Sequence, residues 1–268
     1  MDIARHLASF RTLAVATALT VATLAAAAPA AETTGAKAAG AAAQGPHIVL
    51  VHGAWADGSS WSSVVGRLQQ RGLRVTAVQN PLTSFKDDTD AVLRTLEASP
   101  GPVVLVGHSY GGAVISEVGA HPKVKALVFV AAFAPDQGES LNTLLKDNPP
   151  PKGAINVDGS GFLTLAPGVI GKAFAQDLPA DVVRVLEATQ VPIFAKNFDA
   201  KVNQPAWKSK PSWYLIATQD RMIPPALQQS MSARMKAQVA SVDASHVPMA
   251  SRPDEVANFI ASAAEAAR

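Results

Sequence analysis

The sequence VVLVGHSYGGAVISEV, residues 103–118, contains the strongest structural signal in the chain. Its first four residues are an uncharged apolar run, as in strands buried on both faces of a parallel sheet. Apolar side chains at helical spacing follow from residue 113. Between them, residues 107–111 match Gly-x-Ser-x-Gly, which in this strand–turn–helix context predicts a sharp turn that presents Ser109. Glycine on either side avoids a steric collision there, so the stretch predicts a serine nucleophile at a strand end.

Similar apolar runs recur along the chain, at residues 48–51, 73–78, 126–132, 213–217 and 239–242. Helical patterns lie between them, around residues 64–68, 91–96, 114–118, 227–235 and 256–260. Alternating strands and helices predict right-handed crossovers and a doubly wound, mostly parallel sheet of the α/β class. In such sheets ligands bind beyond the carboxyl ends of the strands, where Ser109 is expected.

One interval, residues 136–210, breaks this alternation and shows no clean strand. It is too long for a plain connection, and segments 141–145, 169–174 and 181–188 are typical of short helices. Asp181, two residues after Pro179, is the expected N-cap of the last of them. We therefore expect a helical cap inserted over the strand ends.

The N-terminal segment has the layout of a secretory signal peptide. Arg5, His6 and Arg11 precede an uncharged run at residues 13–28, which ends in small residues. We expect cleavage near residue 30, a periplasmic or secreted mature protein, and no stable membrane anchor after cleavage. Residues 31–45 lack large apolar side chains and are expected to form a flexible leader, so that residues 46–268 fold.

Composition narrows the possible chemistry. Lys and Arg number 23 against 21 Asp and Glu, and the net charge of +2 argues against nucleic acid as a partner. The chain has no cysteine, which excludes disulfides and a cysteine nucleophile. No residues have metal-ligand spacing and no glycine-rich loop fits a nucleotide, so no cofactor is expected.

A serine nucleophile needs a base and an acid that orients the base. His246 follows the last predicted strand and lies after Ser109, in the chain order of this architecture. His52 is the rival base, although it precedes the serine. Asp220 follows the fifth predicted strand and is the expected acid, with Asp136 as its rival one strand earlier.

Acyl transfer also needs donors for the developing oxyanion. The first predicted strand ends in HGAW, residues 52–55, and its turn would bring the Ala54 amide over the strand ends. The Tyr110 amide begins the helix after Ser109. Alternatively, His52 and Gly53 form only a strand-ending turn.

The segments HGAW (52–55), GHSYGG (107–112) and SHVPMASRP (245–253), together with Asp220, resemble the α/β-hydrolase superfamily. Within it they are similar to the branch of plant methyl esterases and hydroxynitrile lyases with their bacterial esterase relatives. The resemblance covers about residues 46–268. It implies Ser109 as nucleophile, His246 as base, Asp220 as acid, and the amides of Ala54 and Tyr110 as oxyanion hole.

Two positions indicate the reaction. Plant hydroxynitrile lyases of this branch carry Thr where this chain has Gly53 and Lys where it has Val247, and both positions here are esterase-like. The resemblance therefore implies ester hydrolysis through an acyl-enzyme. A serine at position 109 excludes relatives of this fold that use an aspartate nucleophile.

The substrate is less defined by the sequence. Residues 136–210 contain eight Lys or Arg and eight Asp or Glu, so we expect a small or medium neutral ester. Five aromatic residues of this interval are expected in the cap core rather than in a pocket: Phe162, Phe174, Phe194, Phe198 and Trp207. A non-catalytic ligand-binding or receptor-like member, or a lactonase, perhydrolase or acyltransferase with the same triad, remains an alternative.

Overall fold

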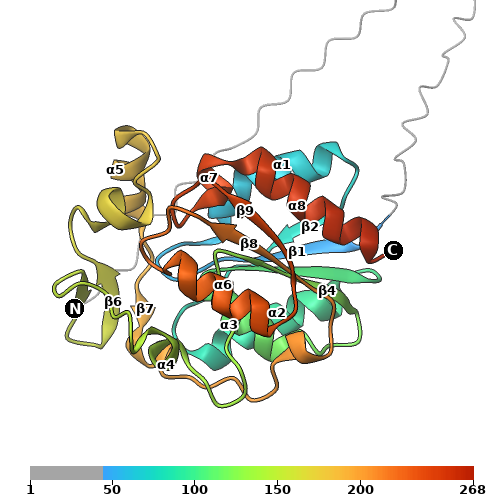
Figure 1. Ribbon diagram of the computed structural model, residues 1–268, viewed down its shortest axis with the longest axis horizontal. Helices are drawn as coiled ribbons and strands as arrows, with labels where there is room; N and C mark the ends of the chain where they lie inside the picture. Colours follow the sequence, from blue (N-terminus) through green and yellow to red (C-terminus); the bar gives the residue numbers. More distant parts are fainter. Residues whose placement is uncertain (1–44) are drawn as a thin grey trace, which may run out of the picture. The chain divides into compact units, whose positions relative to one another are not determined.

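A computed structural model of the chain describes residues 45–268 (Figure 1). The predicted signal peptide, residues 1–30, and all but the last residue of the predicted leader lie outside the described residues. Among the residues described, no helix is long and apolar enough to cross a membrane.

The centre of the fold is a six-stranded parallel sheet with the order β2-β1-β3-β4-β8-β9. Its strands are β1 (His47–Val51), β2 (Val75–Ala77), β3 (Val103–His108), β4 (Val124–Val130), β8 (Ser212–Ala217) and β9 (Gln238–Val242). Every residue of β1, β3 and β8 is buried, which explains why these strands are continuous apolar runs rather than alternating patterns. Each predicted run corresponds to one strand, and the predicted α/β class is confirmed.

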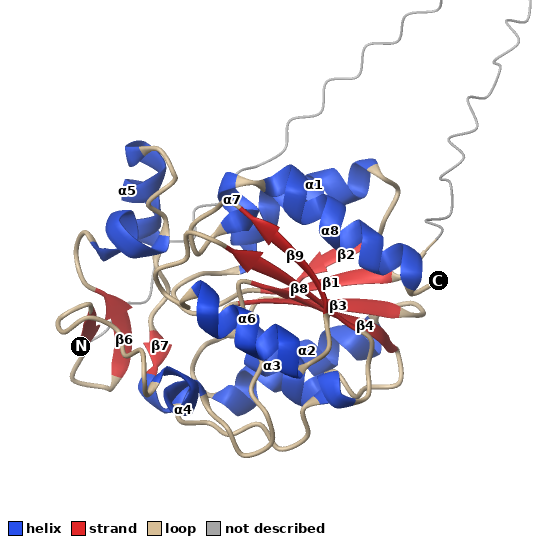
Figure 2. Ribbon diagram, in the orientation of Figure 1, coloured by secondary structure: helices blue, strands red, loops and turns tan. Residues whose placement is uncertain are grey.

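Helices cover both faces of this sheet (Figure 2). The helices α1 (Ser62–Gln70), α7 (Pro248–Ser251) and α8 (Pro253–Ala266) lie on one face, and α2 (Phe85–Ala98), α3 (Gly111–Val118) and α6 (Pro225–Arg234) lie on the other. The short helix η1 (Gly58–Trp61) leads into α1. In α1 the buried residues are Val64 and Leu68, one turn apart, as expected for an amphipathic surface helix.

Most of the chain between β4 and β8, up to η3, forms a separate layer at one end of the sheet, called the cap below (Figure 1). It contains α4 (Leu141–Leu145), β5 (Ile155–Val157), β6 (Phe162–Leu165), η2 (Ile170–Phe174), α5 (Ala180–Thr189), β7 (Ile193–Phe194) and η3 (Ala195–Phe198). After the cap, η4 (Ala206–Lys208) packs against α3, and the chain returns to the start of β8. The three short helices expected from the sequence correspond to α4, η2, which is a π-helix, and α5.

Two expectations for the cap are wrong. It is not purely helical, because β5, β6 and β7 form a three-stranded antiparallel sheet. These strands are two to four residues long and partly exposed, too short to produce a clear alternating pattern. Asp181 is not the N-cap of α5: the cap residue is Pro179, and Asp181 lies in the first turn, where its charge favours the helix N-terminus.

Candidate active site

Ser109 lies at a sharp turn between β3 and α3. Its φ angle is 52°, a strained value for a residue with a side chain. A Cβ on Gly107 would lie 2.7 Å from the Gly111 carbonyl oxygen, and a Cβ on Gly111 would lie 2.7 Å from that of Val51. Both positions therefore require glycine. The Ser109 carbonyl accepts hydrogen bonds from the amides of Gly112 (2.9 Å) and Phe133 (3.1 Å), which hold the turn in place.

Three side chains, each beyond the end of a different strand, meet above this edge of the sheet. The Oγ of Ser109 lies 2.8 Å from Nε2 of His246, and Nδ1 of His246 lies 2.7 Å from Oδ2 of Asp220. They are 5%, 1% and 4% exposed in the order Ser109, His246, Asp220. The structure thus brings together the three residues that the sequence singled out, although 137 positions separate the serine from the histidine.

The carboxylate of Asp220 is held by four donors. Oδ1 accepts hydrogen bonds from the amides of Met222 (2.7 Å) and Ile223 (2.9 Å), and Oδ2 accepts one from Gln228 Nε2 (2.8 Å) as well as from His246. Several donors fix the orientation of the carboxylate. An ionised Asp220 orients the imidazole and places the acceptor nitrogen of the ring toward Ser109.

The rival residues do not reach the serine. Both ring nitrogens of His52 bind backbone groups: Nδ1 donates to the Gly53 carbonyl and Nε2 accepts from the Asn80 amide, each at 2.9 Å. Burial lowers the pKa of His52 and keeps it neutral. Asp136 instead forms a salt bridge of 2.5 Å with Lys208.

His108 has a contact that the sequence did not predict. Its Nε2 lies 2.7 Å from the carbonyl oxygen of His246, and the two rings are 4.9 Å apart. Complete burial is the main cause that lowers the pKa of His108 well below its ordinary value, and the nearby His246 lowers it further. The neutral ring therefore donates to the His246 backbone and supports the loop that carries the imidazole. No sequence signal reveals this contact because the acceptor is a main-chain group 138 residues away.

The two candidate oxyanion donors flank the serine. A Cβ on Gly53 would lie 2.8 Å from Cβ of Ser109, so the turn that carries Ala54 passes directly against the nucleophile. Within residues 45–268 the amides of Ala54 and Tyr110 donate to no protein acceptor. Two free amides beside a serine hydroxyl fit the requirement for oxyanion stabilisation.

The cap contacts the loops that carry the acid and the base. Phe174 of η2 packs edge-on against the His246 ring, with centroids 5.1 Å apart. The carboxylate of Asp177 accepts a hydrogen bond from the amide of Ser245 (2.9 Å), next to His246. On the acid side, Gln176 donates to the Gln219 carbonyl at 2.6 Å.

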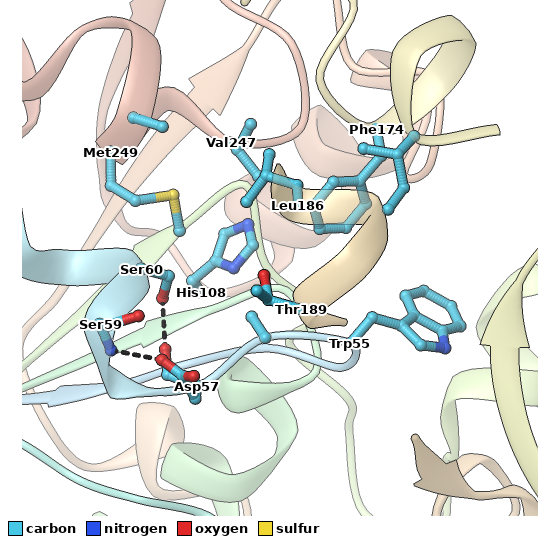
Figure 3. A pocket seen from close by; sticks show the side chains of 13 residues that line it. Trp55, Asp57, Ser59, Ser60, His108, Phe174, Leu186, Thr189, Val247 and Met249 are labelled. Atoms are coloured by element: carbon cyan, nitrogen blue, oxygen red, sulfur yellow. Dashed lines mark hydrogen bonds between the residues drawn. The ribbon is translucent and has the colours of Figure 1, made fainter. Parts of the chain in front are cut away.

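A cavity of about 80 Å³ lies between η1, the cap and the His246 loop (Figure 3). Its larger apolar lining residues are Trp55, Ile170, Phe174, Leu186, Val247 and Met249. The lining also includes His108 beside Ser109, and Val247 directly follows His246. Of the five aromatic residues expected in the cap core, Phe174 alone lines this cavity, so that expectation is wrong for Phe174. Its ring connects the cavity to the imidazole of His246.

Known proteins resemble this chain in sequence and in fold. Residues 48–259 match the alpha/beta hydrolase family. The chain belongs to that family. A carbendazim hydrolyzing esterase from Nocardioides sp. is 33% identical over 156 residues, which cover 52% of this chain and 63% of that protein.

Other members of the alpha/beta hydrolase family match over more of the chain. A pyrethroid hydrolase from Sphingobium wenxiniae is 27% identical over 250 residues, covering 82% of this chain and 88% of that protein. A polyneuridine aldehyde esterase from Rauvolfia serpentina is among the relatives by sequence. The crystal structure of polyneuridine aldehyde esterase shares the fold of this chain, with a TM-score of 0.73. The crystallised esterase is 21% identical to this chain, and the match covers 82% of this chain and 99% of the crystallised one. The expected resemblance to plant esterases and their bacterial relatives is confirmed.

Proposed function

We propose that this protein is a serine hydrolase that cleaves carboxylic esters through an acyl-enzyme on Ser109. The observation that carries the proposal is the continuous hydrogen-bonded chain from Ser109 through His246 to Asp220. Its chemistry is that of a nucleophile, a general base and an orienting carboxylate. The esterases and hydrolases among the relatives support the same reaction class.

In the first half of the reaction, His246 Nε2 takes the Ser109 proton while Oγ attacks the ester carbonyl carbon. The amides of Ala54 and Tyr110 stabilise the negative charge that develops on the carbonyl oxygen. The protonated imidazole then gives its proton to the alcohol oxygen, the carbon–oxygen bond breaks, and the alcohol leaves. The acyl group remains on Ser109.

In the second half, His246 takes a proton from water as the water oxygen attacks the acyl carbon. The intermediate collapses, Ser109 recovers its proton from the imidazole, and the carboxylic acid leaves. Throughout, Asp220 stays ionised and stabilises the imidazolium that forms.

The substrate we propose is a small or medium neutral ester with an apolar group. The cavity beside the site is lined mainly by apolar side chains, and a pocket of this kind favours uncharged groups. Relatives that are named for hydrolysis of carbendazim and of pyrethroids support small organic substrates.

A two-part experiment tests the proposal. Incubation with a fluorophosphonate and intact-mass measurement should give one adduct on the wild type and none on Ser109→Ala. A panel of p-nitrophenyl esters, methyl esters and lactones should show turnover that Ser109→Ala lowers by about 10⁴-fold or more. Full activity of Ser109→Ala on the best ester contradicts the mechanism. Absence of both adduct and turnover in the wild type favours a non-catalytic binding protein.

We also propose that the mature protein is exported, on the basis of the N-terminal sequence pattern. N-terminal sequencing of the native protein should then begin near residue 31. Recovery of Met1 on the purified native protein contradicts export by cleavage of a signal peptide.

A further inference from the structure

Asp88, in the first turn of α2, has a completely buried carboxylate outside the Ser109–His246–Asp220 chain. Its Oδ1 accepts a hydrogen bond from the amide of Leu82 (2.7 Å). Its Oδ2 accepts one from the Tyr110 hydroxyl (2.5 Å) and one from Asn197 Nδ2 (3.2 Å). Asn197 Nδ2 also lies 3.2 Å from the Tyr110 hydroxyl, which closes a buried three-residue network.

This network contains no cation. Within residues 45–268, no Lys, Arg or His forms an ion pair with Asp88. Burial is the main cause that raises the pKa of Asp88 from 3.8 to about 6, against the effect of the hydrogen bonds. A buried carboxylate without a counterion lowers the free energy of unfolding. An apolar residue at this position would cost less, yet the chain carries Asp88 there.

The three donors come from three different parts of the molecule. Tyr110 directly follows Ser109, and its backbone amide is one of the proposed oxyanion donors. Asn197 belongs to η3 of the cap and is 1% exposed. Leu82 lies in the loop before α2, in a left-handed conformation with a φ of 59°. One carboxylate thus connects the nucleophile turn, the cap and this loop.

The Tyr110 side chain is held along its length. Its ring is 0% exposed and packs edge-on against Phe85, with centroids 6.3 Å apart, while Asp88 and Asn197 bind its hydroxyl. A residue whose side chain cannot shift has a backbone amide that cannot shift easily either. Oxyanion stabilisation depends on donors that are already in position when the charge develops.

We infer that Asp88 is a positioning residue that, through the Tyr110 hydroxyl, fixes the Tyr110 amide for oxyanion stabilisation and couples it to Asn197 of the cap. This inference rests on the proposed function. It predicts a loss in the chemical step rather than in substrate binding, because the Asp88 side chain does not touch the substrate cavity.

The test compares Asp88→Asn, Tyr110→Phe and the double variant on the best p-nitrophenyl ester. Rates are expressed per active site, counted by fluorophosphonate adducts after labelling has reached its plateau. Asp88→Asn and Tyr110→Phe should each lower kcat per site by about tenfold, less than the 10²–10³-fold typical for loss of a direct donor. KM should change by less than about twofold. The double variant should be little worse than either single one, because the amide in Asp88→Asn sets a donor against the donors around it and so disrupts the same network that Tyr110→Phe breaks.

Leu96→Ala provides the matched control, since Leu96 is completely buried on the same helix and lies outside the network. It should lower the melting temperature and leave kcat per site unchanged. If Asp88→Asn behaves in the same way, with fewer labelled sites but an unchanged rate per site, the inference is wrong and Asp88 is only structural. Additive losses in the double variant also contradict it.

Tyr110→Phe keeps the test decisive if Asp88→Asn does not fold, because an unchanged kcat per site in Tyr110→Phe alone overturns the inference. Failure of the proposed function has a different result: the wild type itself then shows no adduct on Ser109 and no ester turnover.

Discussion

The sheet edge and the cap contribute to the same candidate site in different ways. The sheet edge supplies Ser109 and Asp220 from loops that follow the fully buried strands β3 and β8, and His246 from the loop after the edge strand β9. The cap has short elements, and its helix α5 has no buried residue, with Val182 and Val185 38% and 59% exposed. Dense packing resists displacement, whereas sparse packing tolerates it. We infer that the sheet sets the chemistry and that the cap adjusts position and selectivity.

The largest effect is expected at the sheet edge. Asp220→Asn should lower kcat by about 10⁴-fold, because the amide no longer orients the imidazole or stabilises its protonated form. Steady-state kinetics on the best ester would measure it. Asp136→Asn is the matched control and should stay within about twofold, since Asp136 binds Lys208 away from the site. A large loss in Asp136→Asn together with an active Asp220→Asn would reverse the assignment of the acid.

The second effect concerns Asp88, which contacts both regions. Its pKa is raised from 3.8 to about 6, so the native state keeps a proton that the unfolded chain releases between these values. The stability of the wild type relative to Asp88→Asn should therefore be highest below pH 3.8 and fall as the pH rises from there through 6, by about 3 kcal/mol in total. Denaturant unfolding of both proteins at pH 4 and pH 7 measures most of this difference. A difference that is the same at both values contradicts the raised pKa.

A smaller effect is expected where the cap touches the base. Asp177→Ala removes the acceptor of the Ser245 amide and should lower kcat by about tenfold, because small displacements of a catalytic group reduce the rate. Asp181→Ala, in the exposed first turn of α5, is the control and should change kcat by less than about twofold. Equal rates for Asp177→Ala and the wild type would show that the cap does not position His246.

The smallest effect is expected at Leu186 of α5, which lines the cavity. Leu186→Ala should raise KM for a small apolar ester by about threefold and leave kcat nearly unchanged. The substitution removes apolar contact that the ester makes equally in the ground state and in the transition state. Val185→Ala, the exposed neighbour that does not line the cavity, should leave both constants unchanged. A fall in kcat for Leu186→Ala, with KM unchanged, would contradict a role limited to binding.

The same contrast explains what the sequence predicts and what it misses. The central strands β1, β3, β4 and β8 are predictable because they are buried and read as apolar runs, and Ser109 because glycines mark the turn that holds it. His246 and Asp220 follow from chain order. The strands of the cap are missed because they are short and partly exposed.

The supporting contacts are invisible for another reason. In the sequence Asp88 is one of two neighbouring acidic residues at a helix start, and only the folded chain places it against Tyr110 and Asn197. Likewise, His108 and Asp177 bind main-chain groups of the His246 loop, which have no side-chain signature. Contacts of this kind depend on tertiary packing rather than on a local pattern.

The most direct test of the account is a rapid-mixing experiment with a p-nitrophenyl ester, combined with acid quenching and peptide mass mapping. We expect a burst of p-nitrophenol approaching one equivalent per active site, and an acyl group on the peptide that contains Ser109. Turnover with neither a burst nor an acylated Ser109 peptide, or an acyl group on another residue, would contradict the central claim.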